Sequence, residues 1–152
     1  MLDDMAIAGI RELRRLPEAK VIAHWIELFV AGKQAGYAKP DPSAFIGKDP
    51  TWVEVEIPHD LYSADWNQED ADLSSSQLER ASKYARAGGA LPPGMATYSG
   101  RRRKGKPTGK AFVADGNHRA YAAFLRGDPV ARFYMPLVDL ERFKNDVGSE
   151  HR

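Results

Sequence analysis

The chain has 152 residues, which is the usual size of one domain and too short for two ordinary ones. With 43% hydrophobic and 28% charged residues it is expected to form a packed core, and its formal net charge of +1 predicts no overall attraction to nucleic acid. The absence of cysteine excludes disulfides, thiolate metal sites and a thiol nucleophile. The first residues lack the pattern of a secretory signal and no apolar run is long enough to cross a bilayer, so we expect a cytoplasmic protein that does not bind membranes.

Residues 2–31 are expected to be helical, because apolar side chains recur there at helical spacing. Pro17 is expected to separate two helices, since proline is tolerated in a first helical turn. Residues 32–50 are rich in glycine and proline and predict a surface loop. We therefore expect residues 1–50 to form an N-terminal helical extension, able to mediate a homodimer, and residues 51–152 to form the domain proper.

Strands and helices alternate from residue 51 onward. Trp52 to Ile57 alternate apolar and acidic side chains, as a half-buried strand does. Ser76 and Glu79 form a capping-box pattern at the start of a helix, which Gly88 and Gly89 are expected to end. Further strands are expected at 95–98, 111–114 and 130–135, and further helices at 117–125 and 137–143. This order predicts a single small α/β (α+β) domain with a mixed sheet.

The turn between the strand at 111–114 and the helix at 117–125 has the residues of an anion site. The first amides of a helix lack intrahelical partners and lie at the positive end of its dipole. Gly116 would allow close approach of a ligand, Asn117 and His118 would add donors, and Arg119 offers a cation suited to phosphate oxygens. The same residues also form an ordinary turn, in which Asp115 or Asn117 simply caps the helix.

The segment VADGNHRAYAAFLRG, preceded by a helix and by LPPG at residues 91–94 and followed by the strand VARFYM, resembles the ParB/sulfiredoxin superfamily. The resemblance covers roughly residues 51–140 and implies that fold. In that superfamily a G-x-[HR]-R turn at a helix start binds nucleotide phosphates. The resemblance therefore implies that the nucleotide lies against six residues, which are Pro93, Gly94, Gly116, Asn117, His118 and Arg119.

Departures from the superfamily narrow the implied activity. Sulfiredoxins use a cysteine in this turn, where this chain has Asn117, so sulfinic acid reduction by that mechanism is excluded. Partitioning ParB proteins carry further domains after this fold, whereas only a short tail follows Met135, so we do not expect a full-length partitioning protein. Two branches stay open. One is the free serine kinases, which have a similar turn, and the other is the small ParB-like nucleases or NTPases.

Phosphoryl transfer or hydrolysis needs a carboxylate to activate a nucleophile or to hold a metal. Asp115, beside the turn, is the expected ligand of Mg²⁺ that arrives with ATP or CTP. His118 is the expected phosphate ligand or general acid and base. Glu54 and Glu56 share one face of their strand, and we assign Glu56 as a further catalytic candidate; alternatively, both lie on the solvent face of an edge strand. The expected function is nucleotide binding coupled to hydrolysis or transfer of a phosphate bond.

A basic turn precedes the strand at 111–114. Six of the ten residues in RRRKGKPTGK are basic, namely Arg101, Arg102, Arg103, Lys104, Lys106 and Lys110. Clustered positive charge attracts nucleotide phosphates and nucleic-acid backbones, although a solvated hairpin tip has the same composition. The alternative functions are thus a small DNA-binding protein or nuclease, and a non-enzymatic interaction module on the same fold.

Overall fold

The computed structural model describes residues 8–33, 47, 49–64, 66–67, 74–86, 89, 91–100, 102–103, 106–107 and 109–150. The elements follow one another as β1 (Arg11–Pro17), α1 (Glu18–Lys33), β2 (Thr51–Pro58), the 3-10 helix η3 (His59–Leu61), β3 (Tyr62–Ser63), α2 (Ser75–Arg86), β4 (Gly94–Thr97), β5 (Arg102–Arg103), β6 (Lys106–Pro107), β7 (Ala111–Asp115), α3 (Asn117–Arg126), β8 (Val130–Pro136) and α4 (Leu137–Glu150). None of the helices in this part of the chain is long and apolar enough to cross a membrane.

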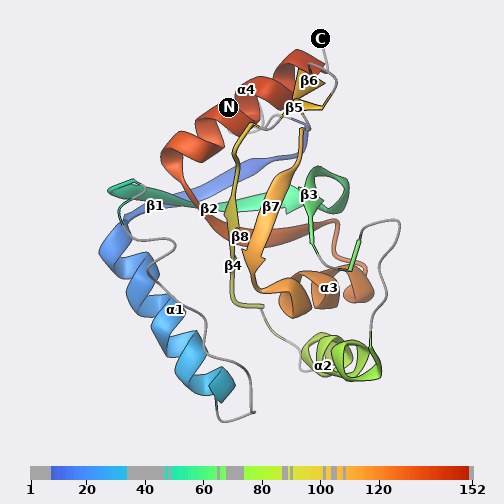
Figure 1. Cartoon of the computed structure of the whole chain (residues 1–152). Helices are drawn as coiled ribbons and strands as arrows, with labels where there is room; N and C mark the ends of the chain where they lie inside the picture. The colour runs from blue at the N-terminus through green and yellow to red at the C-terminus, as the bar shows by residue number, and fades with distance from the viewer. Residues whose placement is uncertain are drawn as a thin grey trace.

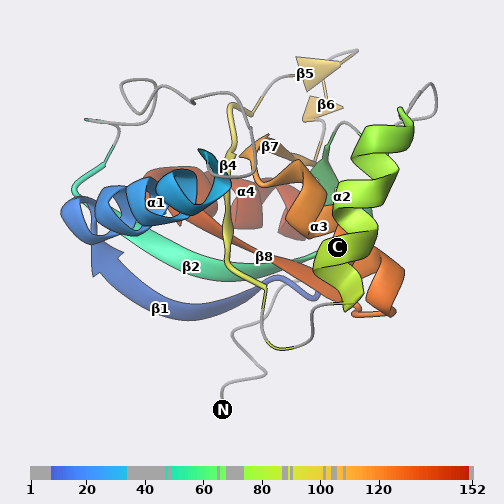
Figure 2. The same ribbon diagram turned by 90° about the horizontal axis from the view of Figure 1, so that it is seen from below.

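Six strands form one mixed sheet in the order β1-β2-β8-β4-β7-β3, and β5 pairs with β6 as a separate hairpin. Strand β2 pairs antiparallel with β1 and β8, and β7 pairs antiparallel with β4. The β4–β8 and β3–β7 pairs are parallel. In Figure 1, β4 and β7 run steeply across β1 and β2, and Figure 2 shows β1, β2 and β8 side by side as one curved layer. The expected α/β class with a mixed sheet is therefore confirmed.

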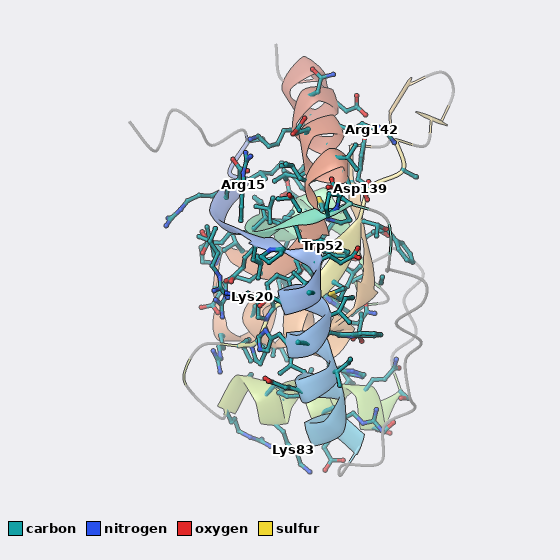
Figure 3. All side chains as sticks on the ribbon, turned by 90° about the vertical axis from the view of Figure 1, so that its left-hand side faces the viewer. Arg15, Lys20, Trp52, Lys83, Asp139 and Arg142 are labelled. Carbon is teal, nitrogen blue, oxygen red and sulfur yellow. The ribbon has the colours of Figure 1, made fainter. Side chains whose placement is uncertain are left out.

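The two faces of the sheet are buried by different helices. Val53, Val55 and Ile57 of β2 join the larger core cluster, which also contains residues of α3 and α4. Trp52, on the opposite face of β2, joins a smaller cluster with Val21 and Trp25 of α1. Figure 3 places Trp52 beside the first turns of α1, and its indole Nε1 donates to Glu18 at 3.3 Å. Because successive side chains of a strand point to opposite faces, β2 contributes residues to both core clusters.

The prediction that residues 2–31 are helical is wrong for residues 11–17, which form the strand β1. Their backbone pairs with β2, and charged side chains also meet across the two strands. Arg14 Nε lies 2.9 Å from Glu54 Oε1, and Arg11 Nη1 lies 3.8 Å from Glu56 Oε1. Helix α1 begins at Glu18, directly after Pro17. The first 50 residues therefore contribute a strand of the sheet and are not a helical extension alone.

The remaining predictions differ from the structure mainly at element ends. The capping pair of α2 is Ser74 and Gln77, because Ser74 N donates to Gln77 Oε1 at 2.8 Å and Gln77 N donates to Ser74 Oγ at 3.3 Å. The pair predicted at Ser76 and Glu79 lies inside the helix instead. The strands and helices expected between residues 95 and 143 are confirmed as β4, β7, α3, β8 and α4. Most of the loop expected at residues 32–50 lies outside the described residues.

Candidate functional site

The predicted anion site is the junction of β7 and α3. Strand β7 leads directly into Gly116, whose φ of +89° is in the left-handed region, and α3 begins at the next residue. The first backbone bond of the helix runs from Ala120 N to Gly116 O at 3.0 Å, so the amides of residues 117–119 precede it. The first turn of α3 has no acidic residue but carries His118 and Arg119. The cation of Arg119 thus lies at the positive end of the helix dipole.

Two glycines bring the LPPG segment against this turn. A Cβ on Gly116 would lie 2.7 Å from the Cα of Gly94, and a Cβ on Gly94 would lie 2.6 Å from the carbonyl oxygen of Asp115. Real Cβ atoms do not approach backbone atoms this closely, so both positions require glycine. The structure therefore brings Gly94 beside the turn, as the sequence predicts. It also gives Gly116 a packing role that the sequence did not indicate.

Arg119 joins the same two segments. Its Nη1 donates to the carbonyl oxygen of Pro93 at 3.0 Å, and its Nη2 lies 3.9 Å from Asp115 Oδ2. The Arg119 side chain is only 12% exposed, and burial lowers the pKa of its guanidinium, partly offset by the charge of Asp115. The sequence predicts that this cation binds a ligand. In the structure it also connects the start of α3 to the segment that leads into β4, through its hydrogen bond to Pro93.

Asp115 is held by a residue that sequence reasoning did not single out. The indole Nε1 of Trp25, on α1, donates to Asp115 Oδ2 at 2.5 Å. A buried tryptophan needs an acceptor for its N–H, but no pattern in the sequence indicates which residue supplies it. Next to it on α1, His24 Nδ1 lies 2.6 Å from the hydroxyl of Tyr134. Helix α1 is therefore fixed to the sheet through polar contacts beside the candidate site.

The residues at the turn offer little support for a metal of their own. No group of three or more His, Cys, Asp or Glu side chains suited to a metal ion occurs among the described residues. Mg²⁺ commonly binds through one or two carboxylates together with substrate phosphates. The turn itself supplies one carboxylate, that of Asp115, whose Oδ2 accepts from Trp25 Nε1.

The two glutamates of β2 have different surroundings. Glu54 is 5% exposed and accepts from Arg14 Nε and Arg132 Nη1, each at 2.9 Å. Glu56 pairs with Arg11 and lines a cleft of about 550 Å³. Because β2 lies between β1 and β8, the alternative that these glutamates face solvent from an edge strand is wrong.

The predicted site residues thus divide between two neighbouring places. Asp115, Gly116, Asn117 and His118 belong to the turn, where the Nε2 atom of His118 is shielded from solvent. Glu56 lies in the cleft, and Arg119 belongs to both places because it also lines the cleft wall. Sequence reasoning missed Arg11, Arg126 and Arg132 in that wall, although Arg126 follows Arg119 by two helical turns on α3.

The basic turn forms a hairpin of β5 and β6, in which Arg102 pairs with Pro107 and Arg103 with Lys106. Lys110, directly before β7, is exposed. The side chains of the other five basic residues, from Arg101 to Lys106, lie outside the described part of the structure. Their proximity to the turn remains a prediction.

No protein-family model matches the chain, and comparison with curated proteins and with solved structures finds no match either. A functional assignment therefore depends on the geometry of the turn and on the motif it carries.

Proposed function

We propose that the turn from Gly116 to Arg119 binds the phosphate groups of a nucleotide, on a domain of ParB/sulfiredoxin-like architecture. The observation that carries this proposal is the charge at the start of α3. Its first turn contains the cation of Arg119 and no acidic residue, although carboxylates are the side chains that stabilise this end of a helix. Asp115, at 3.9 Å from Arg119, offsets this charge only in part. A bound phosphate would complete the neutralisation.

The surrounding residues have consistent roles in this proposal. The amides of residues 117–119 and the guanidinium of Arg119 would contact phosphate oxygens, and Pro93 and Gly94 would form the adjacent wall. His118 would orient or protonate the phosphate. Mg²⁺ bound with ATP or CTP would offset phosphate charge, and Asp115 would be its ligand from this chain. Hydrolysis or transfer of a phosphate bond is the activity expected from such a set.

Thermal unfolding with and without ligand tests the binding step. A ligand that binds only the folded protein raises Tm by mass action. We expect ATP or CTP with Mg²⁺ to raise Tm, in a screen that also includes GTP, ADP and inorganic phosphate. The rise should disappear in His118→Gln and in Arg119→Ala, each compared with its own unliganded Tm. Arg142→Ala, which removes an exposed arginine of α4 (Figure 3), is the matched control and should retain the rise.

Turnover is tested by phosphate release from whichever nucleotide raises Tm. Release that falls in Arg119→Ala and persists in Arg142→Ala would support the enzymatic extension. A nucleotide-induced rise of equal size in wild type and Arg119→Ala, or no rise with any nucleotide, would overturn the proposal and leave the turn as a structural helix start.

DNA binding by the basic hairpin is a second candidate, favoured by one observation. The β5–β6 pairing forms a two-stranded ribbon that carries Arg102, Arg103 and Lys106, and such ribbons can bind DNA. Affinity for duplex DNA should then fall steeply with salt and with Arg102→Gln. An affinity for DNA that changes neither with salt nor with Arg102→Gln would rule out this function.

A further inference from the structure

The cleft that Arg119 lines is unusually rich in arginine. It opens between α3, the segment that leads into β4 and the ends of β1, β2 and β8, and its volume is about 550 Å³. That volume falls within the range of small-molecule sites, roughly 300–1,000 Å³. Its charged lining residues are Arg11, Arg119, Arg126, Arg132, Glu56 and Asp128. Arginines therefore outnumber carboxylates in the wall by four to two.

Backbone carbonyl groups in and after α2 hold three of these arginines. Arg126 donates to the carbonyl oxygens of Tyr84, Ala85 and Gly89 at 3.0, 3.1 and 2.7 Å. Arg119 donates to Pro93 O, and Arg132 Nη2 donates to Leu91 O. Carbonyl groups orient a guanidinium but carry no net charge. The three cations are thus fixed in position while their charge is not cancelled by these contacts.

Carboxylates around the cleft compensate the arginines only in part. Glu54 accepts from Arg132 and also from Arg14, so its single charge is shared between two cations. Glu56 lies 3.8 Å from Arg11, which is beyond hydrogen-bond distance. Within the described part of the chain, Arg126 has no carboxylate within ion-pair distance. Asp115 lies 3.9 Å from Arg119 Nη2, which is also beyond hydrogen-bond distance. A ligand with negative charge would therefore add to a charge compensation that these carboxylates leave incomplete, most of all at Arg126.

We propose that this cleft binds a small anion that carries two or more negative charges on oxygen. Arg11 and Arg132 contact it from the sheet, and Arg119 and Arg126 contact it from α3. Backbone carbonyls already orient the guanidiniums of Arg119, Arg126 and Arg132, which reduces the entropy lost on binding. This site adjoins the nucleotide turn and shares Arg119 with it, whereas Arg11, Arg126 and Arg132 belong to the cleft alone.

Calorimetric titration of the whole chain at low salt tests the site, with inorganic pyrophosphate and citrate as probes. The two probes distinguish a phosphate ligand from a polycarboxylate one, and binding of either supports the proposal. Arg11→Gln should raise the Kd about fivefold, because it removes one partly exposed charge-assisted contact. Glu56→Gln should lower the Kd by a similar factor, since it removes a like charge and frees Arg11.

Arg15→Gln is the matched control, because Arg15 is on the same strand and similarly exposed, 58% against 62% for Arg11, yet does not line the cleft. It should leave the Kd unchanged. Failure of both probes to bind wild type would overturn the proposal, and so would equal weakening by Arg15→Gln and Arg11→Gln.

The same variants separate this site from the nucleotide turn. Pyrophosphate binding that is lost in His118→Gln but unaffected by Arg11→Gln would assign the anion to the turn and overturn the cleft proposal. A nucleotide-induced Tm rise that is lost in Arg11→Gln but kept in His118→Gln would place the nucleotide in the cleft, which supports the cleft and overturns the turn as the nucleotide site.

Discussion

Helix α3 is bounded by two glycines, Gly116 and Gly127. Replacing each by alanine measures how much the close backbone contact between Gly94 and Gly116 contributes to the stability of the protein. Gly116 precedes the helix with a φ of +89°, and Gly127 follows it with a φ of +84°. An alanine in this left-handed region costs about 1–2 kcal/mol at either position. Only the surroundings differ, because a Cβ on Gly127 would meet nothing within 4 Å.

At Gly116 the added Cβ would lie 2.7 Å from Gly94 Cα and 3.2 Å from Arg119 Nη2. Relief requires the backbone at Gly94 to move, and such overpacking costs about 1–3 kcal/mol. The sum predicts that Gly116→Ala destabilises the protein by about 2–5 kcal/mol, against about 1–2 kcal/mol for Gly127→Ala. Since domains are stable by only about 5–15 kcal/mol, the larger loss is a substantial part of the total.

Urea denaturation of wild type and both variants measures these losses, provided that the m value is unchanged. Gly94→Ala adds an independent measurement, because its Cβ would lie 2.6 Å from Asp115 O without any left-handed strain. It should cost about 1–3 kcal/mol. If Gly116→Ala lowers the free energy of unfolding no more than Gly127→Ala does, the contact between Gly94 and Gly116 does not hold the turn in place and the prediction is wrong.

Three further outcomes are expected. Trp25→Phe should lower the free energy of unfolding by about 1–3 kcal/mol, because Asp115 loses the indole N–H that it accepts; an unchanged urea midpoint would contradict this. Arg126→Gln should cost about 1–3 kcal/mol, since the side chain loses bonds to two carbonyls in the last turn of α2 and to that of Gly89 just after it, with Arg142→Gln as a near-neutral control in the same assay. Burial raises the pKa of the Tyr62 phenol above its ordinary value of about 10, so this group stabilises the fold below pH ~10 and the stabilisation is lost as pH rises above that value. Tyr62→Phe should therefore reduce the loss of the free energy of unfolding at alkaline pH. A pH profile of stability identical to that of wild type would show that the Tyr62 phenol does not cause this loss.

The elements that the sequence predicts correctly are those whose burial is encoded locally. Strand β2 alternates apolar and acidic residues because its two faces enter different surroundings, and α3 ends at Gly127, whose N–H bonds back to the helix. Strand β1 is the opposite case. RELRRLP is charged and has no alternation, so only its pairing with β2, some 40 residues away, makes it a strand. Charged residues on an edge strand are common because they discourage further pairing.

The candidate site likewise combines features that the local sequence encodes with contacts that distant residues supply. The strand, glycine and helix start are local features, and they are present where the sequence predicts them. The partners of these residues are not local: Asp115 accepts from Trp25, 90 residues away, and Arg119 donates to Pro93, 26 residues away. A motif therefore indicates which residues gather at the turn. It does not reveal which of them are already engaged with the rest of the chain.

The position of β8 in the sheet has a consequence for synthesis of the chain. Strand β2 pairs with β8 from Trp52 opposite Pro136 to Pro58 opposite Val130, and β8 also pairs with β4. The two halves of the sheet, β1–β2 on one side and β4–β7–β3 on the other, are thus joined by a strand near the carboxyl end. Because β8 follows the other five strands of this sheet in the chain, the edges of β2 and β4 that pair with it stay open to other strands until β8 has been synthesised.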